Sequence, residues 1–187
     1  MNIALPQTYL IGLSSLLLII AILVGRQLFK VRQDEIKLIR LEKGGINSSS
    51  QDSADLYELA SVQLRKRLYP QAISSLRQAL KQLHDDEPNE AKALIENALG
   101  FALAAENDFK GAIVHYKKAL KAKSDYPVAL NNLAFANERL MQDEEAYAIY
   151  YEVIKLQPNN KTALTQIEKI ERRTGLKPES IKGKKGF

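Results

Sequence analysis

Three stretches of the 187-residue chain repeat one pattern of small and large apolar residues. The clearest marker is an alanine that recurs as Ala72, Ala112 and Ala146. The first interval between these alanines is longer than the second, and its six extra residues fall around the HDDEPN segment at 84–89. A chain with such a period folds into stacked copies of one small unit, because each copy buries its apolar face only against its neighbours.

Each unit is expected to be a helix, a tight turn and a second helix, since no stretch after Asp52 alternates with the two-residue period of a strand. Small residues are expected where the two helices of a unit cross: Ala60, Gly100 and Ala134 on the first helix, and Ala72, Ala112 and Ala146 on the second. Large residues are expected to fill the space around them: Leu56, Leu59, Leu76, Leu99, Tyr116, Leu130, Leu133 and Tyr150. The interval from Ala112 to Ala146 matches the helix–turn–helix period of about 34 residues that is typical of tetratricopeptide repeats (TPRs). The sequence therefore predicts an all-α solenoid of three TPR units.

The array needs a last helix that covers the third unit and presents polar residues to solvent. The segment KTALTQIEKIERR, 161–173, is expected to be this cap, with Leu164, Ile167 and Ile170 facing inward. The repeat domain with its capping helix is thus predicted at 53–173. The remaining segment, 174–187, is polar, basic and interrupted by Gly and Pro, which predicts a disordered basic tail.

The N-terminal 25 residues carry no charged side chain, and the run from Leu5 to Val24 is dominated by Leu and Ile. Twenty helical residues span about 30 Å, the thickness of a bilayer core. Residues 1–25 are therefore predicted to be a single-pass transmembrane anchor that contacts membrane lipid through residues 5–24. A cleaved signal peptide fits less well, because no Lys or Arg precedes the apolar run and no small-x-small cleavage site follows it.

Basic residues follow the apolar run directly, at Arg26, Lys30 and Arg32. By the positive-inside rule, the rest of the chain is expected on the cytoplasmic side or its organellar equivalent. Residues 26–43 are predicted to form a basic helical stalk, because they contain good helix formers and no Gly or Pro. The segment GGINSSSQD, 44–52, is predicted to be a flexible linker.

The basic residues lie outside the repeats. Residues 26–45 carry a net charge of +3 and residues 172–187 carry +5, which leaves −3 for residues 46–171. A nucleic-acid-binding domain concentrates Lys and Arg on its own surface, so no nucleic-acid partner is predicted. Basic flanks beside an anchor instead favour contact with anionic lipid headgroups.

Catalytic chemistry finds little support in the sequence. There is no Cys, and the two histidines, His84 and His115, are expected to be solvated surface residues. The chain has neither a Gly-rich phosphate loop nor a nucleophile motif. We therefore predict no enzyme activity, no catalytic or metal-binding residue and no cofactor.

The predicted function is protein binding on the concave surface that the first helices of TPR units line. The candidate groove residues, three from each unit, are Tyr57, Ser61, Leu64, Asn97, Phe101, Ala104, Asn131, Phe135 and Glu138. Phe101 and Phe135 occupy the same place in successive units, so an exposed pair would anchor a partner whose backbone bonds to Asn97 and Asn131. The alternative is that both rings belong to the core.

One known TPR activity, the clamping of a chaperone's C-terminal carboxylate, requires Lys and Arg at set groove positions. Here those positions are Tyr57, Ser61, Ala98, Val128 and Asn132. None of them is a cation, so this activity is not predicted.

Several features extend beyond a generic repeat: a short anchor, the RQLFKVRQ stalk, the long first junction, and the segments NALGFALA, NNLAFA and QPNNKTA. Over nearly the whole chain this combination resembles the cyanobacterial and plastid-encoded TPR protein family implicated in photosystem I assembly or stabilisation. One departure is Ser124, where the repeat usually has Pro, with Pro127 three residues later. The resemblance implies a thylakoid membrane protein whose array lies in the cytosol or stroma and assists photosystem I subunits or assembly intermediates.

Two other functions remain open at this point. One is a general membrane-tethered adaptor that docks a soluble protein or another membrane complex. The other is a periplasmic TPR factor for cytochrome maturation, which the basic flank after the anchor disfavours.

Overall fold

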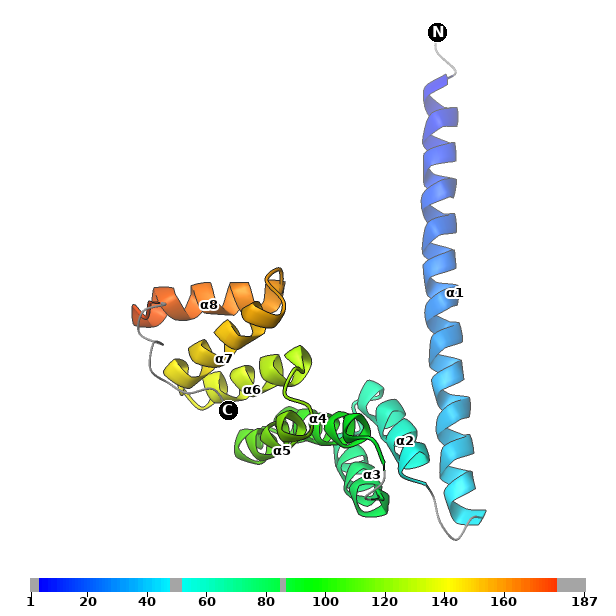
Figure 1. Ribbon diagram of the computed structural model, residues 1–187. Coiled ribbons are helices and arrows are strands. Elements are labelled where there is room, and N and C mark those ends of the chain that lie inside the picture. The colour runs from blue at the N-terminus through cyan, green and yellow to red at the C-terminus, as the bar shows by residue number, and fades with distance from the viewer. Residues whose placement is uncertain (1–3, 48–51, 85–86, 178–187) are drawn as a thin grey trace. The chain divides into compact units, whose positions relative to one another are not determined.

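The chain consists of helices joined by short connections. The computed structural model describes residues 4–47, 52–84 and 87–177, and its contacts divide the chain into one unit up to Ser49 and another from Ser50. The first unit contains α1 (Ala4–Asn47). The second contains α2 (Ser53–Arg65), α3 (Tyr69–Gln82), α4 (Asn89–Ala105), α5 (Phe109–Ala122), α6 (Pro127–Arg139), α7 (Asp143–Leu156) and α8 (Lys161–Thr174), as Figure 1 shows. The predicted all-α fold, with three helical pairs and a final helix, is confirmed.

Helix α1 includes the stretch Tyr9–Gln33, which is long and apolar enough to cross a bilayer, although a signal sequence meets the same criteria. None of this stretch is buried. The helix continues through the predicted stalk and then through Gly44 and Gly45 to Asn47. The first part of the predicted linker is thus helical, because glycine lowers helix propensity by about 1 kcal/mol without itself ending a helix.

Within each helical pair, the turn between the helices contains one residue in the left-handed conformation. These residues are Arg67, Asn107 and Met141, with φ of 60°, 65° and 59°. The amide of the following residue donates to a carbonyl five residues earlier, as in Leu68 N–H to Gln63 O at 2.9 Å and Asp108 N–H to Leu103 O at 2.9 Å. Such a turn reverses the chain within a few residues and satisfies carbonyls at the end of the first helix. The second helix therefore packs directly against the first.

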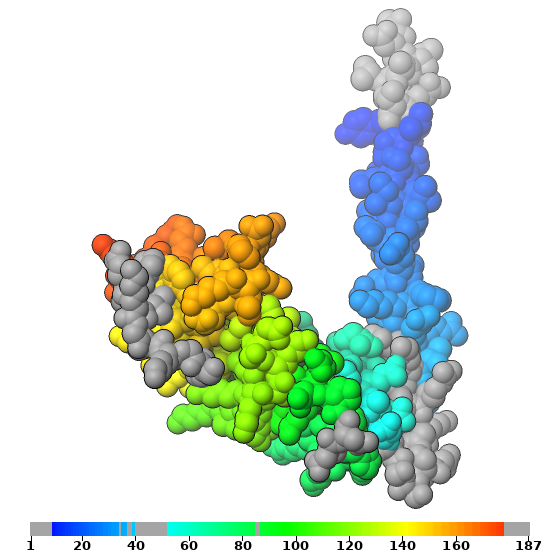
Figure 2. Space-filling model, viewed as in Figure 1, coloured from blue at the N-terminus to red at the C-terminus, as the bar shows by residue number. Residues whose placement is uncertain are grey.

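The small residues occupy the helix crossings, as predicted. Ala60, Ala72, Ala112, Ala134 and Ala146 are fully buried, and Gly100 is buried as well. The predicted large residues Leu56, Leu59, Leu76, Leu99, Tyr116, Leu130, Leu133 and Tyr150 are also buried. Burial raises the pKa of the Tyr116 hydroxyl above its usual value of 10.0. Figure 2 shows the array as a continuous band of packed side chains.

The long first junction is held by the carboxylate of Glu87. The Ser53 hydroxyl donates to both Glu87 oxygens, at 3.0 and 3.1 Å, and the backbone N–H of His84 donates to Oε1 at 3.3 Å. Because Ser53 begins α2 and Glu87 precedes α4, these bonds connect the starts of two successive first helices. The junction is therefore attached to the array even though it is longer than the later one.

The capping helix α8 covers the third unit with a narrower apolar face than expected. Ile167 and Ile170 are buried, but Leu164 is 45% exposed, so its predicted inward orientation is wrong. Polar contacts hold the helix in place: the Tyr147 hydroxyl donates to Glu171 at 2.6 Å, and Arg173 pairs with Asp143 at 2.6 Å. The helix ends at Gly175, whose φ of 74° closes its last turn. Most of the predicted disordered tail, 178–187, lies outside the described residues.

A methyl group at Gly100 is predicted to destabilise the array although alanine favours helix. An added Cβ would lie 2.6 Å from Cε1 of the buried Tyr116 ring, so backbone or ring must move. We expect Gly100→Ala to lower the free energy of unfolding by about 1–3 kcal/mol, measured by chemical denaturation.

At the corresponding repeat positions the first unit has Ala60 and Leu76, and the third has Ala134 and Tyr150, so only the first combines the methyl group with a smaller side chain. Tyr116→Leu should therefore restore part of the loss in the double variant, by about 1 kcal/mol relative to additivity. If the losses of the two single variants simply add in the double variant, the strain at Gly100 does not come from the Tyr116 ring.

Candidate protein-binding groove

The first helices of the three units lie closer together than the second helices do. Direct contacts join α2 to α4 and α4 to α6, whereas the second helices α3, α5 and α7 contact one another less. A solenoid curves toward the side on which its elements approach most closely. The first helices thus line the concave side of the array, and the second helices line the convex side, an arrangement that can be followed in Figure 1.

Large apolar side chains are exposed on the concave side. Phe101 on α4 is 46% exposed and Phe135 on α6 is 42% exposed, so neither ring belongs to the buried core. Seven residues before each Phe stands another exposed apolar residue, Leu94 at 42% and Val128 at 53%. Seven residues are two helical turns, which places each pair on one face of its helix. We call the set Leu94, Phe101, Val128 and Phe135 the apolar row.

Leu94 and Val128 were not among the predicted groove residues. They also stand at matching places in successive units, separated by the same interval as the two phenylalanines. The same comparison between units that singled out the phenylalanines would therefore have found them.

The Phe135 ring packs against a residue of the second unit. It meets the Phe109 ring edge to face, with centroids 6.4 Å apart. The Arg139 guanidinium lies over both rings, 5.0 Å from the Phe109 centroid and 6.0 Å from that of Phe135. Edge-to-face and cation–π contacts each favour one ring orientation. Phe135 is thus held in place before any partner binds.

The predicted amides differ in what they can offer a partner. Asn97 Nδ2 donates to the Tyr126 hydroxyl at 3.4 Å, and Asn97 Oδ1 accepts from Asn132 Nδ2 at 3.0 Å. Asn97 is therefore engaged within the chain. By contrast, Asn131 Oδ1 is buried and has no hydrogen-bond partner among the described residues. An unsatisfied buried acceptor is rare in folded proteins, but this oxygen is not exposed in the groove, so a partner could reach it only after the Asn131 side chain rotates.

The remaining predicted residues are half-buried: Tyr57, Ser61, Leu64, Ala104 and Glu138. The Ser61 hydroxyl donates to the Tyr57 carbonyl at 2.8 Å. Glu138 lies 3.7 Å from the Arg173 guanidinium and accepts from the Tyr150 hydroxyl at 3.5 Å. These polar groups already have partners, so the exposed apolar contact area lies mainly on α4 and α6.

Tyr126, in the junction before α6, is a further groove residue that the sequence did not suggest. Its hydroxyl is half-buried beside Asn97 and Tyr57. Burial and the nearby Tyr57 raise the pKa of Tyr126, and the hydrogen bond from Asn97 offsets part of that rise. The hydroxyl therefore stays protonated and acts as a neutral hydrogen-bonding group.

The prediction that both histidines are solvated surface residues is wrong for His115. Its Nδ1 lies 2.6 Å from Glu96 Oε2, and the two side chains are 18% and 5% exposed. The contact joins α4 to α5 across 19 residues of sequence. Within the described part of the chain, no group of three or more His, Cys, Asp or Glu is placed to hold a metal ion. The pair instead links the two helices of the second unit in its interior.

The cost of removing His115 is predicted to depend on the Glu96 carboxylate. His115→Ala leaves the Glu96 carboxylate buried without its partner, which should lower the free energy of unfolding by about 1–3 kcal/mol. In a Glu96→Gln background the same substitution should cost less, since no buried charge is left behind. Equal costs in the two backgrounds, measured by chemical denaturation, would contradict a structural role for the contact.

Comparison with known proteins gives consistent results. A TPR repeat family model matches residues 98–140. The chain is 31% identical to the ycf37 protein of Guillardia theta, over 89% of this chain and 93% of that protein. It is also 31% identical to ycf37 of Cyanophora paradoxa, over 87% of this chain and 93% of that protein. The chloroplastic TPR domain-containing protein PYG7 of Arabidopsis thaliana is 29% identical over 94% of this chain, which spans 57% of PYG7.

Solved structures match the repeat domain. MamA superposes with a TM-score of 0.66 and 20% identity, over 75% of this chain and 78% of MamA. The first TPR domain of Spaghetti (RPAP3), bound to the HSP90 peptide SRMEEVD, gives a TM-score of 0.61 and 22% identity, over 70% of this chain and 99% of that one. At these identities the likeness establishes the TPR fold alone.

Proposed function

Because the chain belongs to the ycf37 family of TPR proteins, we propose that it is a membrane-anchored scaffold that binds protein segments and supports photosystem I assembly or stability. Two findings support the cellular setting: a chloroplastic relative in Arabidopsis thaliana and the apolar stretch Tyr9–Gln33. The photosystem I assignment follows the family resemblance. TPR proteins generally serve as non-enzymatic interaction scaffolds, and the family model that matches residues 98–140 is a TPR repeat.

The observation that carries the proposal is the apolar row on the concave side. Four large apolar side chains remain 42–53% exposed on α4 and α6, although the same helices bury most of their other apolar side chains. A contiguous exposed apolar surface in a soluble domain marks an interaction site. The Phe135 ring is oriented in advance by Phe109 and Arg139, which lowers the entropy lost on binding.

The chemistry of the groove describes the segment that it would accept. Apolar side chains of the partner would pack against the row. The five carboxylate-clamp positions hold no Lys or Arg. The proposed partner segment is therefore apolar and extended or helical, unlike the acidic HSP90 peptide bound by Spaghetti.

Truncating the apolar row is predicted to abolish partner binding while leaving the array folded. Phe101→Ala is the cleaner single change, because Phe135 also contacts Phe109. We expect Phe101→Ala to weaken binding by about 2 kcal/mol, or roughly thirtyfold, and the Phe101→Ala, Phe135→Ala double variant to lose it. The measurement is co-purification of photosystem I subunits from solubilised membranes, with the melting midpoint of each variant as a check on folding.

The chain offers a matched control in two valines. Val128 lies in the apolar row and is 53% exposed, whereas Val114 lies on the second helix α5 and is 51% exposed. Val128→Ala should reduce co-purification, and Val114→Ala should not. A folded double Phe variant that keeps its photosystem I partners would refute the proposal that the apolar row binds them. Loss of a different complex by that variant would instead favour a general membrane adaptor.

The anchor and its orientation are tested separately. We expect the full chain to remain with membranes after carbonate extraction, because about 20 apolar residues bind a bilayer irreversibly. Protease added to vesicles that expose their cytoplasmic or stromal side should digest the array, since Arg26, Lys30 and Arg32 flank the apolar run. Protection of the array in such vesicles would reverse the topology and favour the periplasmic alternative.

A further inference from the structure

Charge is segregated between the second helices of the array. Helices α3 and α5 together carry six basic side chains and no acidic one. Helix α7 carries four acidic side chains and one basic. The net charge of −3 over residues 46–171 conceals this division. The convex side of the array is thus strongly positive over its first two units.

The cations recur at matching places in successive units. Arg77 on α3 corresponds to Lys117 on α5, at the same interval that separates Ala72 from Ala112. Lys81 corresponds in the same way to Lys121, and Lys155 on α7 takes that position in the third unit. Because the units stack with a constant geometry, residues at one repeat position form a row across the helices. We call Arg77, Lys81, Lys117, Lys121 and Lys155 the basic strip.

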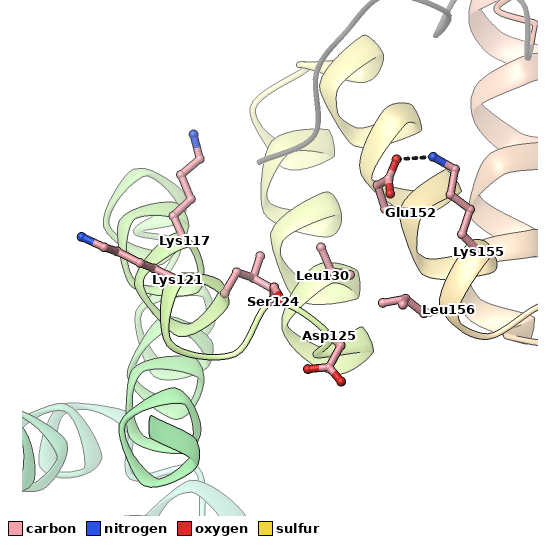
Figure 3. Close-up of a pocket in the computed structure, with 9 residues that line it drawn as sticks. Lys117, Lys121, Ser124, Asp125, Leu130, Glu152, Lys155 and Leu156 are labelled. Atoms are coloured by element: carbon pink, nitrogen blue, oxygen red, sulfur yellow. Dashed lines mark hydrogen bonds and ion pairs between the residues drawn. The ribbon is translucent and has the colours of Figure 1, made fainter. Parts of the chain in front are cut away.

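Most of this charge is not neutralised within the described part of the chain. Arg77, Lys81 and Lys121 are exposed and have no ion-pair partner there, and the same holds for Lys110 and Lys118 on α5. Lys155 is paired with Glu152. Figure 3 shows the Lys117 and Lys121 side chains extending from α5 away from α6. Among the described residues, exposed cations without an ion-pair partner are therefore more numerous on α5 than on α3.

A hollow of about 790 Å³ interrupts the strip between α5 and α7. Leu120 and Leu130 form a buried apolar part of its wall, and Leu156 is exposed at its α7 side. Asp125 and Glu152 also line it, which weakens the positive potential toward α7. On a convex surface the middle helix meets a flat partner first, and here the middle helix, α5, is the most basic.

We infer that the basic strip rests on the anionic headgroups of the membrane that holds α1. This inference depends on the anchor in the proposed function but not on the groove or its partner. Each Lys near an anionic leaflet adds to the attraction, and a tethered array has a high effective concentration at the bilayer surface. A row of flexible ammonium groups suits a laterally continuous anionic surface, because it requires no bidentate geometry.

Single-stranded nucleic acid fits this face less well. Such partners are bound through aromatic side chains on which bases stack between basic groups. Helix α3 has no exposed large hydrophobic residue, and α5 has only Val114. No exposed aromatic ring therefore lies among these cations. The strip offers positive charge without aromatic rings for base stacking. An anionic lipid surface requires only the charge.

The experiment uses the full chain in lipid nanodiscs and measures how close the array lies to the headgroups. The sequence has no Cys, so Gln78→Cys gives one labelling site, at the repeat position that Lys118 occupies on α5. A fluorophore there is quenched by spin-labelled headgroups when the array docks. Val128→Cys reports from the concave side, and co-elution with the nanodisc reports the anchor independently.

The test compares two triple variants of equal net charge. One replaces Arg77, Lys81 and Lys121 of the basic strip by Gln, and the other replaces the exposed Lys92, Lys161 and Lys169, which lie outside the strip, by Gln. In nanodiscs of anionic phosphatidylglycerol at low salt, we expect the fluorophore at position 78 on α3 to be quenched. The fluorophore at position 128 on the concave side should not be quenched. The strip variant should reduce the ratio of docked to undocked array by about tenfold or more, and the control variant by less than about twofold. Quenching should also disappear in neutral phosphatidylcholine and at about 0.5 M salt.

Several results would overturn the inference. Co-elution without quenching in anionic nanodiscs would reject docking and leave the anchor intact. Loss of co-elution would reject the anchor, and the inference with it. Equal losses in the two triple variants, with unchanged melting midpoints, would assign the attraction to net charge rather than to the strip. Strip-dependent binding of poly-uridine to the chain in neutral nanodiscs would assign this face to nucleic acid instead.

Discussion

The close approach of the two helices within each unit determines the rest of the array. In the second unit the crossing is so tight that Gly100 has no room for a methyl group beside the Tyr116 ring. Helices at this separation must be joined by a short reversal, which explains why Arg67, Asn107 and Met141 accept a left-handed backbone. Only Asn among the three favours that conformation, so packing overrides local preference at the other two.

The fold was predictable because its determinants are periodic. Small residues at a fixed spacing within each unit, and alanines that recur from one unit to the next, locate the crossings without any knowledge of long-range contacts. The errors fall where periodicity ends. Leu164 lies on α8, which packs mainly against α7 within the described part of the chain and so buries a narrower face. Glu96 stands at the repeat position of Leu56 and Leu130, and its contact with His115 is revealed only by the packed structure.

The candidate site was predictable to the same degree. The repeat comparison identified Phe101 and Phe135, and it would have identified Leu94 and Val128. It could not distinguish Asn97 from Asn131, since they occupy equivalent positions. What separates them is Tyr126, from a junction outside the repeat pattern, which engages Asn97 and leaves Asn131 Oδ1 without a partner among the described residues. The binding roles of these residues stay predictions.

The two sides of the array differ in chemistry because a helical pair separates them. First helices present apolar rings and neutral amides, and the second helices α3 and α5 present only cations as charged groups. Had the lysines stood in the groove, the array would attract acidic tails, as carboxylate clamps do. Placed on the opposite side, they leave the five clamp positions without a cation and still add a long-range attraction. On the lipid-docking proposal, binding through α3 and α5 would turn the first helices away from the bilayer, so one charge arrangement would both exclude acidic peptides and keep the apolar row accessible.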